Sequence, residues 1–314
     1  MDKQSKIYVA GHRGLVGSAI VRKLEIFGYS NIITRTSKEL DLRQQVEVET
    51  FFAKEQPEYV FLAAAKVGGI LENSTFPGQF LYDNLMIQAN IIEAARQSKV
   101  KKFLFLGSTC IYPKMAPQPL KEEYLLTGEL ESTNEAYAIA KIAGIKMCNA
   151  YNEEYGTNFI SVMPTNLYGP NDNFDLQSSH VLPALIRKIH EAKVNKKSTV
   201  SVWGSGRPLR EFLHADDLAD ACVYLMKHCD AEQIGEFINI GTGKEISIEQ
   251  LALLLCEAIG YEGKLVFDIS KPDGTPRKLT DVSKLHNLGW KHSIKLKEGV
   301  HDTYNWYLDN AIKP

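Results

Sequence analysis

The chain has 314 residues, 44% hydrophobic and 24% charged, and 36 basic against 38 acidic side chains give a net charge of −2. This is the composition of an ordinary globular protein, and without a basic excess it does not indicate a nucleic-acid-binding surface. We expect a cytoplasmic protein with no membrane partner, because no apolar run approaches the roughly 18 residues of a membrane span, no signal core is present, and five scattered cysteines suggest neither disulfides nor a zinc site.

Short apolar runs alternate with helical patterns through the first half of the chain. Strands are expected at KIYVAG, NIITRT, YVFLAAA and KFLFLGST, and FISVMPTNLYGP has the pattern of a further strand that leads into a loop. Helices are expected within EVETFFAKE and over residues 14–27, 79–98 and 136–155. Such alternation predicts an α/β fold with a Rossmann-type, doubly wound parallel sheet and helices on both of its faces.

Beyond about residue 170 the expected elements become shorter, and glycine and proline become more frequent. Amphipathic patterns over 181–192, 216–228, 248–259 and 295–310 predict helices that mostly serve packing. No clear linker separates this part from the first. We therefore predict two regions, residues 1–170 and 171–314, with the smaller α/β C-terminal region interleaved with the first.

Three glycines, Gly11, Gly14 and Gly17, lie between the first expected strand and the first expected helix. Glycine permits a tight turn and lets a pyrophosphate approach the backbone, where the amide groups at a helix start favour phosphate. The spacing alone is a weak indication, since a plain tight turn also uses glycine. The strand before it and the helix after it make nucleotide binding the favoured interpretation.

The end of the second expected strand bears on the choice of cofactor. An NAD site usually places an acidic residue there, whereas this chain has TRTSK. Arg35 at this point and Arg13 in the glycine loop suit the 2′-phosphate of NADP(H). Alternatively, Arg35 and Lys38 are solvated surface residues. Ser37 stands where a second arginine would secure NADP, so the strength of the preference for NADPH over NADH stays open.

A tyrosine and a lysine, Tyr137 and Lys141, lie four residues apart and therefore share one face of an expected helix. An ammonium group near a tyrosine stabilises the phenolate and lowers its pKa, which suits proton transfer. Ser108 ends an expected strand and could donate a hydrogen bond to a substrate carbonyl. An exposed pair is the commoner meaning of this spacing, but Ser108 and the glycine loop reverse that preference.

Cys110 stands two residues after Ser108, where the expected strand ends. Ligands in open α/β sheets bind outside the carboxyl ends of the strands. The thiol is therefore either a small apolar filler or a group that reacts with a ligand at this edge, and the residues alone leave both interpretations open.

Together, the three glycines, Ser108, Tyr137 and Lys141 resemble the extended short-chain dehydrogenase/reductase superfamily over nearly the whole chain. A more specific resemblance, to the GDP-L-fucose synthase family, rests on GHRGLVGSAI, AAAKVGGI, GSTCIYPK, NEAYAIAKIAGIK, MPTNLYGPNDNF, SSHVLPAL, VWGSGRPLREFLH and KPDGTPRK. It implies conversion of GDP-4-keto-6-deoxy-D-mannose to GDP-L-fucose, by epimerisation at carbons 3 and 5 and NADPH-dependent reduction at carbon 4. It also implies a homodimer that pairs the helices at 79–98 and 136–155.

The same resemblance implies the site residues. Ser108, Tyr137 and Lys141 would serve the reduction, and Cys110 and His180 would be the base and acid of the epimerisations. The residues expected at the NADP(H) site are Gly11, His12, Arg13, Gly14, Leu15, Val16, Gly17, Arg35, Asp41, Leu42, Leu106, Gly107, Lys141, Pro164, Thr165, Asn166, Leu167 and His180. The residues expected at the GDP-sugar site are Lys188, Trp203, Arg210, Asp273 and Arg277.

Two other functions remain open at this point. One is a nucleotide-sugar 4,6-dehydratase or 4-epimerase of the same superfamily, although the dehydratases typically carry Asp-Glu where this chain has Thr109-Cys110. The other is an NADP-binding redox sensor without turnover. We expect such a sensor to have lost the Tyr137 and Lys141 pair.

Overall fold

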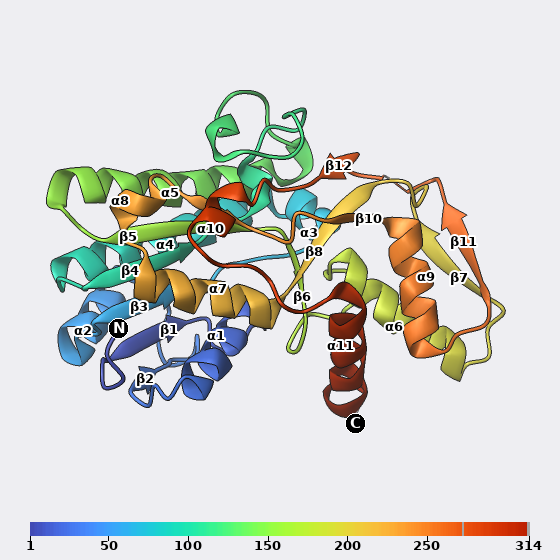
Figure 1. Ribbon diagram of the computed structural model, residues 1–314, viewed down its shortest axis with the longest axis horizontal. Coiled ribbons are helices and arrows are strands. Elements are labelled where there is room, and N and C mark those ends of the chain that lie inside the picture. The colour runs from blue at the N-terminus through green and yellow to red at the C-terminus, as the bar shows by residue number, and fades with distance from the viewer. Residues whose placement is uncertain (272, 313–314) are drawn as a thin grey trace.

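A six-stranded parallel sheet forms the centre of the part of the molecule that contains the N-terminus (Figure 1). The computed structural model describes residues 1–271 and 273–312. The strand order is β2-β1-β3-β4-β5-β9. The strands span β1 Ile7–Ala10, β2 Ile32–Ile33, β3 Tyr59–Leu62, β4 Lys102–Leu106, β5 Phe159–Pro164 and β9 Ile238–Ile240. This sheet, with helices on both faces, confirms the predicted Rossmann-type fold.

The helices divide between the two faces of this sheet according to their apolar residues. On one face, α1 (Leu15–Ile26) and α7 (Ala215–His228) share a buried cluster with β1, β4 and β5. On the other face, α2 (Gln45–Glu55), α4 (Pro77–Gln97) and α5 (Glu135–Tyr155) share a second cluster with β1, β3 and β4. The strands are buried on both faces, which explains why they are almost continuously apolar.

The second strand is shorter than the sequence predicts. Only Ile32 and Ile33 pair with β1, opposite Ile7 and Tyr8, although the apolar and β-branched run NIITRT predicts six residues. The following residues leave the sheet edge, and Thr36 begins a turn in which its carbonyl accepts hydrogen bonds from the amides of Glu39 and Leu40. The turn therefore ends the strand before the β-branched residues do.

A second group of strands lies beside the carboxyl edge of the first sheet (Figure 1). The strand β8 (Leu209–His214) pairs with β10 (Glu245–Ser247), β12 (Arg277–Lys278) and β6 (Asn166–Tyr168), and β7 (Thr199–Trp203) pairs with β11 (Lys264–Asp268). Three helices, α6 (Val181–Val194), α9 (Ile248–Ile259) and α11 (Leu296–Asn310), enclose a third buried cluster with β7 and β8.

Shorter elements complete the described residues. They are α3 Ile70–Thr75, α8 Ala231–Ile234, α10 Ser283–Asn287 and the 3₁₀ turns Thr109–Ile111, Glu122–Tyr124 and Ser132–Asn134. All five cysteines are free thiols. Within residues 1–271 and 273–312, no helix combines the length and apolar character of a membrane span.

Two elements from beyond residue 170 lie with the first sheet. The strand β9 pairs with β5 at its edge, and α7 packs against α1. The division into residues 1–170 and 171–314 stays a prediction, and Pro272 of the KPDGTPRK segment and residues 313–314 lie outside the described residues.

A buried carboxylate, Glu211 on β8, joins three separate segments. Its side chain is fully buried. It accepts hydrogen bonds from the amide and hydroxyl of Thr242, from the amide of Gly243 at 2.7 Å, and from the amide and hydroxyl of Thr280 at 2.9 and 2.6 Å. Hydrogen bonds to an ionised group are stronger than neutral ones. Glu211 therefore ties the loop after β9 and the segment after β12 to β8.

Replacing Glu211 by glutamine should destabilise the fold. The amide would place an N–H group against backbone N–H donors and leave buried groups unpaired, which costs about 3 kcal/mol. We expect a lower urea midpoint for Glu211→Gln. Glu249→Gln, an exposed residue in the first turn of α9, should change stability by less than about 1 kcal/mol. Equal losses in the two variants would contradict the organising role of Glu211.

Candidate active site

The glycine loop joins β1 to α1, and its three glycines serve different purposes. Gly11 has φ of +86°, and a Cβ there would lie 2.7 Å from the amide nitrogen of Ala64. A Cβ on Gly17 would lie 2.1 Å from the carbonyl oxygen of Gly11. Gly14 caps the start of α1 with ordinary backbone angles, and its Cβ would meet nothing closer than 3.6 Å. Of these three glycines, the fold itself therefore requires only Gly11 and Gly17.

The freedom at Gly14 fits a dinucleotide. The chain's own packing gives no reason for glycine there, whereas close approach of a pyrophosphate to the backbone does. The helix that follows has no acidic residue in its first turn, so its amide groups and dipole are available to an anion. Leu15 and Val16 point their apolar side chains toward the first buried cluster and hold the loop in place.

The two arginines expected at the 2′-phosphate differ in whether another side chain is paired with them. The Arg35 guanidinium forms an ion pair with Glu55 at 2.8 Å and lies 5.5 Å from the centre of the Phe51 ring. Arg13 is exposed and has no ion-pair partner among the residues that the structure describes. Of the two, Arg13 is the free cation at this edge.

Three other residues of the predicted cofactor site lie along this edge. Burial lowers the pKa of His12, and the nearby Arg13 cation adds to this effect. The Asp41 carboxylate is paired with Arg43 at 2.8 Å. The backbone carbonyl of Leu42 accepts a hydrogen bond from Asn90 at 3.0 Å, so Leu42 is anchored through its backbone and its side chain packs on the second cluster.

The predicted tyrosine and lysine are brought together on α5. The Lys141 ammonium lies 5.7 Å from the centre of the Tyr137 ring and donates a hydrogen bond to the carbonyl of Leu106 at 2.8 Å. Burial lowers the pKa of Lys141 to about 8. It also raises the pKa of Tyr137, and the nearby Cys110 raises it further.

The pKa of Tyr137 departs from the effect expected of the lysine. The sequence predicts that the nearby ammonium lowers this pKa, but desolvation is the larger influence and raises it. A buried phenolate loses its hydration, and Lys141 directs its hydrogen bond to the backbone of β4 instead.

Cys110 lies in the 3₁₀ turn that follows β4. Ser108 caps this turn, and its hydroxyl accepts a hydrogen bond from the Cys110 amide at 3.4 Å. The predicted pair is therefore one local structure. Burial raises the pKa of the Cys110 thiol, while the Ser108 hydroxyl and the cations of Lys278 and Lys141 act in the opposite direction.

His180 is the residue immediately before α6. The residue as a whole keeps exposed surface, yet the protein around its imidazole excludes enough water to lower its pKa, and the Lys278 cation lowers it further. Its segment is fixed against the loop before α3, because the Gly69 amide donates a hydrogen bond to the carbonyl of Ser178 at 2.9 Å. Lys278 thus acts electrostatically on both Cys110 and His180.

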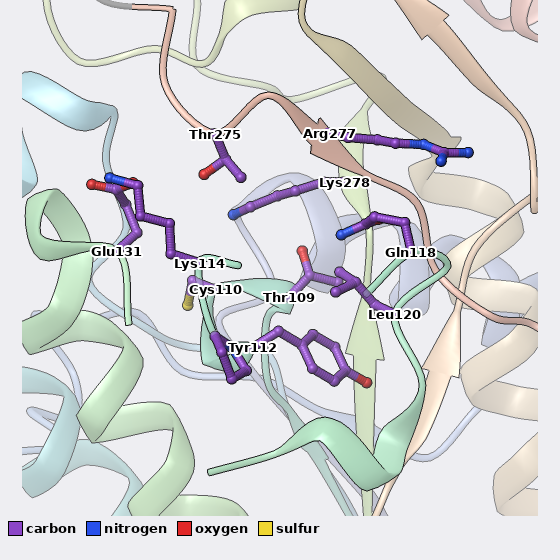
Figure 2. A pocket seen from close by; sticks show the side chains of 11 residues that line it. Thr109, Cys110, Tyr112, Lys114, Gln118, Leu120, Glu131, Thr275, Arg277 and Lys278 are labelled. Carbon is purple, nitrogen blue, oxygen red and sulfur yellow. The ribbon is translucent and has the colours of Figure 1, made fainter. Parts of the chain in front are cut away.

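Lys278 is a site residue that the sequence analysis missed. In β12, Arg277 pairs in register with Leu209 and Lys278 with Arg210. Figure 2 shows the two side chains leaving the strand in opposite directions, with Arg277 turned away and Lys278 turned toward the segment of Cys110. Alternation along a strand predicts opposite faces for neighbours, but a two-residue strand in a Gly/Pro loop could not be recognised from sequence.

The five predicted substrate residues differ in what holds their side chains. Lys188 lies over Trp203, 4.9 Å from its ring centre, and half of Trp203 is exposed. Burial lowers the pKa of Arg210, and the Asp273 carboxylate opposes this effect. Asp273 accepts hydrogen bonds from Ser205, whereas Arg277 is held by Glu245 in a two-point ion pair at 2.7 and 2.8 Å. Arg277 is therefore the only one of the five that is held in an ion pair within residues 1–271 and 273–312.

The chain passes from the first sheet to the second through Pro164, Thr165, Asn166 and Leu167. The Thr165 amide donates to the carbonyl of Ile240 at 3.0 Å, and the Asn166 side chain donates to the carbonyl of Glu211 at 2.8 Å. These bonds hold the four residues at the carboxyl end of β5. On the neighbouring strand, a Cβ on Gly107 would lie 2.3 Å from the sulfur of Met163, so the backbone after Leu106 is closely packed.

Comparison with known proteins places this arrangement in context. The NAD dependent epimerase/dehydratase family matches residues 7–241. GDP-L-fucose synthase 1 of Arabidopsis thaliana is 60% identical over 310 residues, 99% of this chain and 95% of the relative. GDP-L-fucose synthase of Escherichia coli is 54% identical over 316 residues, with 99% and 98% covered. A GDP-L-fucose synthetase structure from Naegleria fowleri bound to NADP is 32% identical, with a TM-score of 0.90 and 99% and 96% covered.

The different purposes of the glycines give a test. Gly14→Ala should leave the thermal stability almost unchanged but weaken NADPH binding by about tenfold or more, since the methyl group would occupy the approach to the backbone. Gly17→Ala should destabilise the protein itself. Gly78→Ala, which meets no atom within 4 Å, is the control. Unchanged NADPH affinity in Gly14→Ala, measured by fluorescence titration, would remove the pyrophosphate from this loop.

Proposed function

This chain belongs to the NAD dependent epimerase/dehydratase family, and we propose that it is a bifunctional epimerase/reductase. It converts GDP-4-keto-6-deoxy-D-mannose to GDP-L-fucose by inverting carbons 3 and 5 and then reducing the 4-keto group with NADPH. The observation that carries this proposal is the placement of Cys110 in a turn capped by Ser108, next to Tyr137 and Lys141. One carbonyl-binding site can then serve all three reactions.

The epimerisations use the acidity that a ketone confers on its neighbouring carbons. Removal of a proton from carbon 3 or 5 gives an enolate, whose charge lies on the oxygen at carbon 4. Ser108 and Tyr137 donate hydrogen bonds to that oxygen. Cys110 removes the proton from one face of the sugar, and His180 returns a proton from the other face. The protein around Cys110 and His180 shifts the pKa of each from its usual value, upward for the thiol and downward for the imidazole.

The reduction uses the same oxygen. The hydride for carbon 4 would come from NADPH when it is bound. Tyr137 donates its phenolic proton to the resulting alkoxide, and the Lys141 ammonium limits the charge that then develops on the phenolate. The raised pKa of Tyr137 keeps this proton in place until the alkoxide forms. Lys141 would also hold the nicotinamide ribose.

The GDP portion of the substrate would lie against the second group of strands. Lys188, Arg210 and Arg277 can neutralise a diphosphate, and the half-exposed Trp203 offers a stacking surface for the base or ribose. Arg277 would have to exchange Glu245 for the diphosphate, whereas Lys188 and Arg210 need no such exchange.

We also propose a cytoplasmic homodimer formed through α4 and α5. These helices pack closely on each other, and they carry the exposed apolar side chains Tyr82 and Ile139. Exposed apolar groups of this size are typical of surfaces between subunits.

The first test follows the sugar protons by NMR in heavy water. With GDP-4-keto-6-deoxy-D-mannose alone, we expect exchange at carbons 3 and 5, and GDP-L-fucose after NADPH is added. Cys110→Ser should lower the exchange at least about 100-fold, the usual contribution of a positioned base, and keep NADPH binding. Tyr137→Phe should retain part of the exchange and lose net reduction. Reduction without exchange would leave a simple 4-keto reductase, and neither activity would favour the dehydratase, 4-epimerase or sensor.

Lys141 gives the reduction a pH dependence. Its pKa of about 8 means that the ammonium is lost as the pH rises through that value, so kcat/KM for the reduction should fall above about pH 8. The free energy of unfolding should instead rise between pH 8 and the usual 10.5. In this range the unfolded chain binds a proton that the folded protein has lost. Residual activity of Lys141→Arg, whose guanidinium stays charged, should lack this decline. A decline identical to that of the unmodified protein would assign it to another group.

A further inference from the structure

The proposed function requires a thiolate at Cys110, and the inference that follows rests on that function. The thiol is buried and its pKa is raised. A thiol in this state is not a base, because the thiolate does the chemistry. A nearby group must therefore accept the thiol proton before the sugar can be deprotonated.

A small cavity lies directly beside the thiol. Its volume is about 10 Å³, which is room for one water molecule. Cys110, Lys278, Glu131, Lys114 and Gln118 are among the residues that line it. The lining includes neither partner of the sugar carbonyl proposed above. Arg277 of the predicted substrate site also lines it.

Four charged residues line this cavity, and all but Arg277 extend their side chains toward it (Figure 2). Figure 2 shows Lys278 reaching in from β12, and Glu131 and Lys114 lying together beyond its amino group. Glu131 and Lys114 form an ion pair at 2.9 Å, and 14% of the Glu131 side chain is exposed against 45% of Lys114. The Glu131 carboxylate also accepts hydrogen bonds from the amide and hydroxyl of Thr133 at 3.4 Å. The Lys278 amine and a carboxylate that is held by Lys114 and Thr133 therefore line the same cavity.

Lys278 and Cys110 each shift the pKa of the other toward its charged form. Burial lowers the pKa of Lys278, Arg210 lowers it further, and Cys110 and Glu131 raise it. The charged groups that act on Cys110 are Lys278 and Lys141, and both lower its pKa. Because the thiol is made a weaker acid and the amine a weaker base, both are neutral more often than in water. A proton shift between them creates an ion pair in which each charge stabilises the other.

We propose that Lys278 is the group that accepts the Cys110 proton, and that Glu131 is a positioning residue that holds and stabilises the resulting ammonium. In this step the S–H bond breaks and an N–H bond forms on Lys278, directly or through one water in the cavity. The thiolate then removes a proton from the sugar carbon and becomes a thiol again. The ammonium releases its proton to solvent through the cavity water and the Glu131 and Lys114 pair, and His180 regains the proton that it gave to the sugar.

The first part of the test needs no substrate. The ultraviolet absorbance of the thiolate is followed against pH in the full-length protein, and the Cys110→Ser signal is subtracted. Lys278→Met should raise the apparent pKa of Cys110 by one unit or more, which is about tenfold less thiolate at a given pH. Glu131→Gln should raise it by a smaller amount, and the matched control Glu129→Gln, exposed on the same loop, should not change it. An unchanged titration in Lys278→Met would overturn the proposal.

Lys278→Arg separates charge from proton transfer. Its guanidinium would keep the thiolate favoured but could not accept or release a proton. We therefore expect a near-normal thiolate titration together with about a tenfold or greater loss of deuterium exchange at carbons 3 and 5. Normal exchange in Lys278→Arg would reduce Lys278 to a fixed charge and refute the transfer. If Lys278→Met does not fold, Lys278→Arg and Glu131→Gln decide the question.

The two proposals can fail separately. If the unmodified protein exchanges no sugar protons, the proposed epimerase fails, while the thiolate titration still tests the pair. If exchange occurs but neither Lys278 variant affects it, the epimerase stands and another group activates Cys110.

Discussion

The buried carboxylate of Glu211 is the interaction on which the site depends. The central sheet alone supplies the glycine loop, Ser108 and the turn of Cys110. It does not supply Lys278, which is placed by the pairing of β12 with β8. That pairing is secured two residues later, where Glu211 accepts both hydrogen bonds of Thr280. Glu211, which accepts hydrogen bonds from five donors, therefore fixes the segment that follows Lys278 against β8.

Desolvation gives this site its chemical character. Burial shifts the pKa of Cys110, Tyr137, Lys141 and Lys278 in the direction that favours the neutral form of each. A proton moved from one neutral group to another leaves a pair of charges, which stabilise each other only while the two groups stay close. Such groups are prepared for proton transfer in both directions, as an epimerisation followed by a reduction requires.

Much of the site could be predicted from sequence because its residues lie on regular elements of the central sheet. The spacing of Tyr137 and Lys141 on a helix, and of Gly11 before a helix and Gly17 in its first turn, follows from local geometry. The pairing of Arg35 with Glu55 and the inward direction of Lys278 could not be predicted. Both depend on contacts between segments far apart in the chain. In addition, β12 has only two residues, too few for an alternation of apolar and polar side chains to be recognised.

The position of β9 has a consequence for the order in which the protein is made. This strand completes the edge of the first sheet beside β5, and α7 covers one face of that sheet, but Ile240 at the end of β9 lies 76 positions after Pro164 at the end of β5. At ordinary rates of translation, this interval lasts roughly 4–15 s. During that time β5 has an open edge and the apolar face under α7 is uncovered. The nascent chain must therefore pass through a stage that exposes a strand able to pair with other chains, and this need for protection during synthesis follows directly from the interleaving of the two regions.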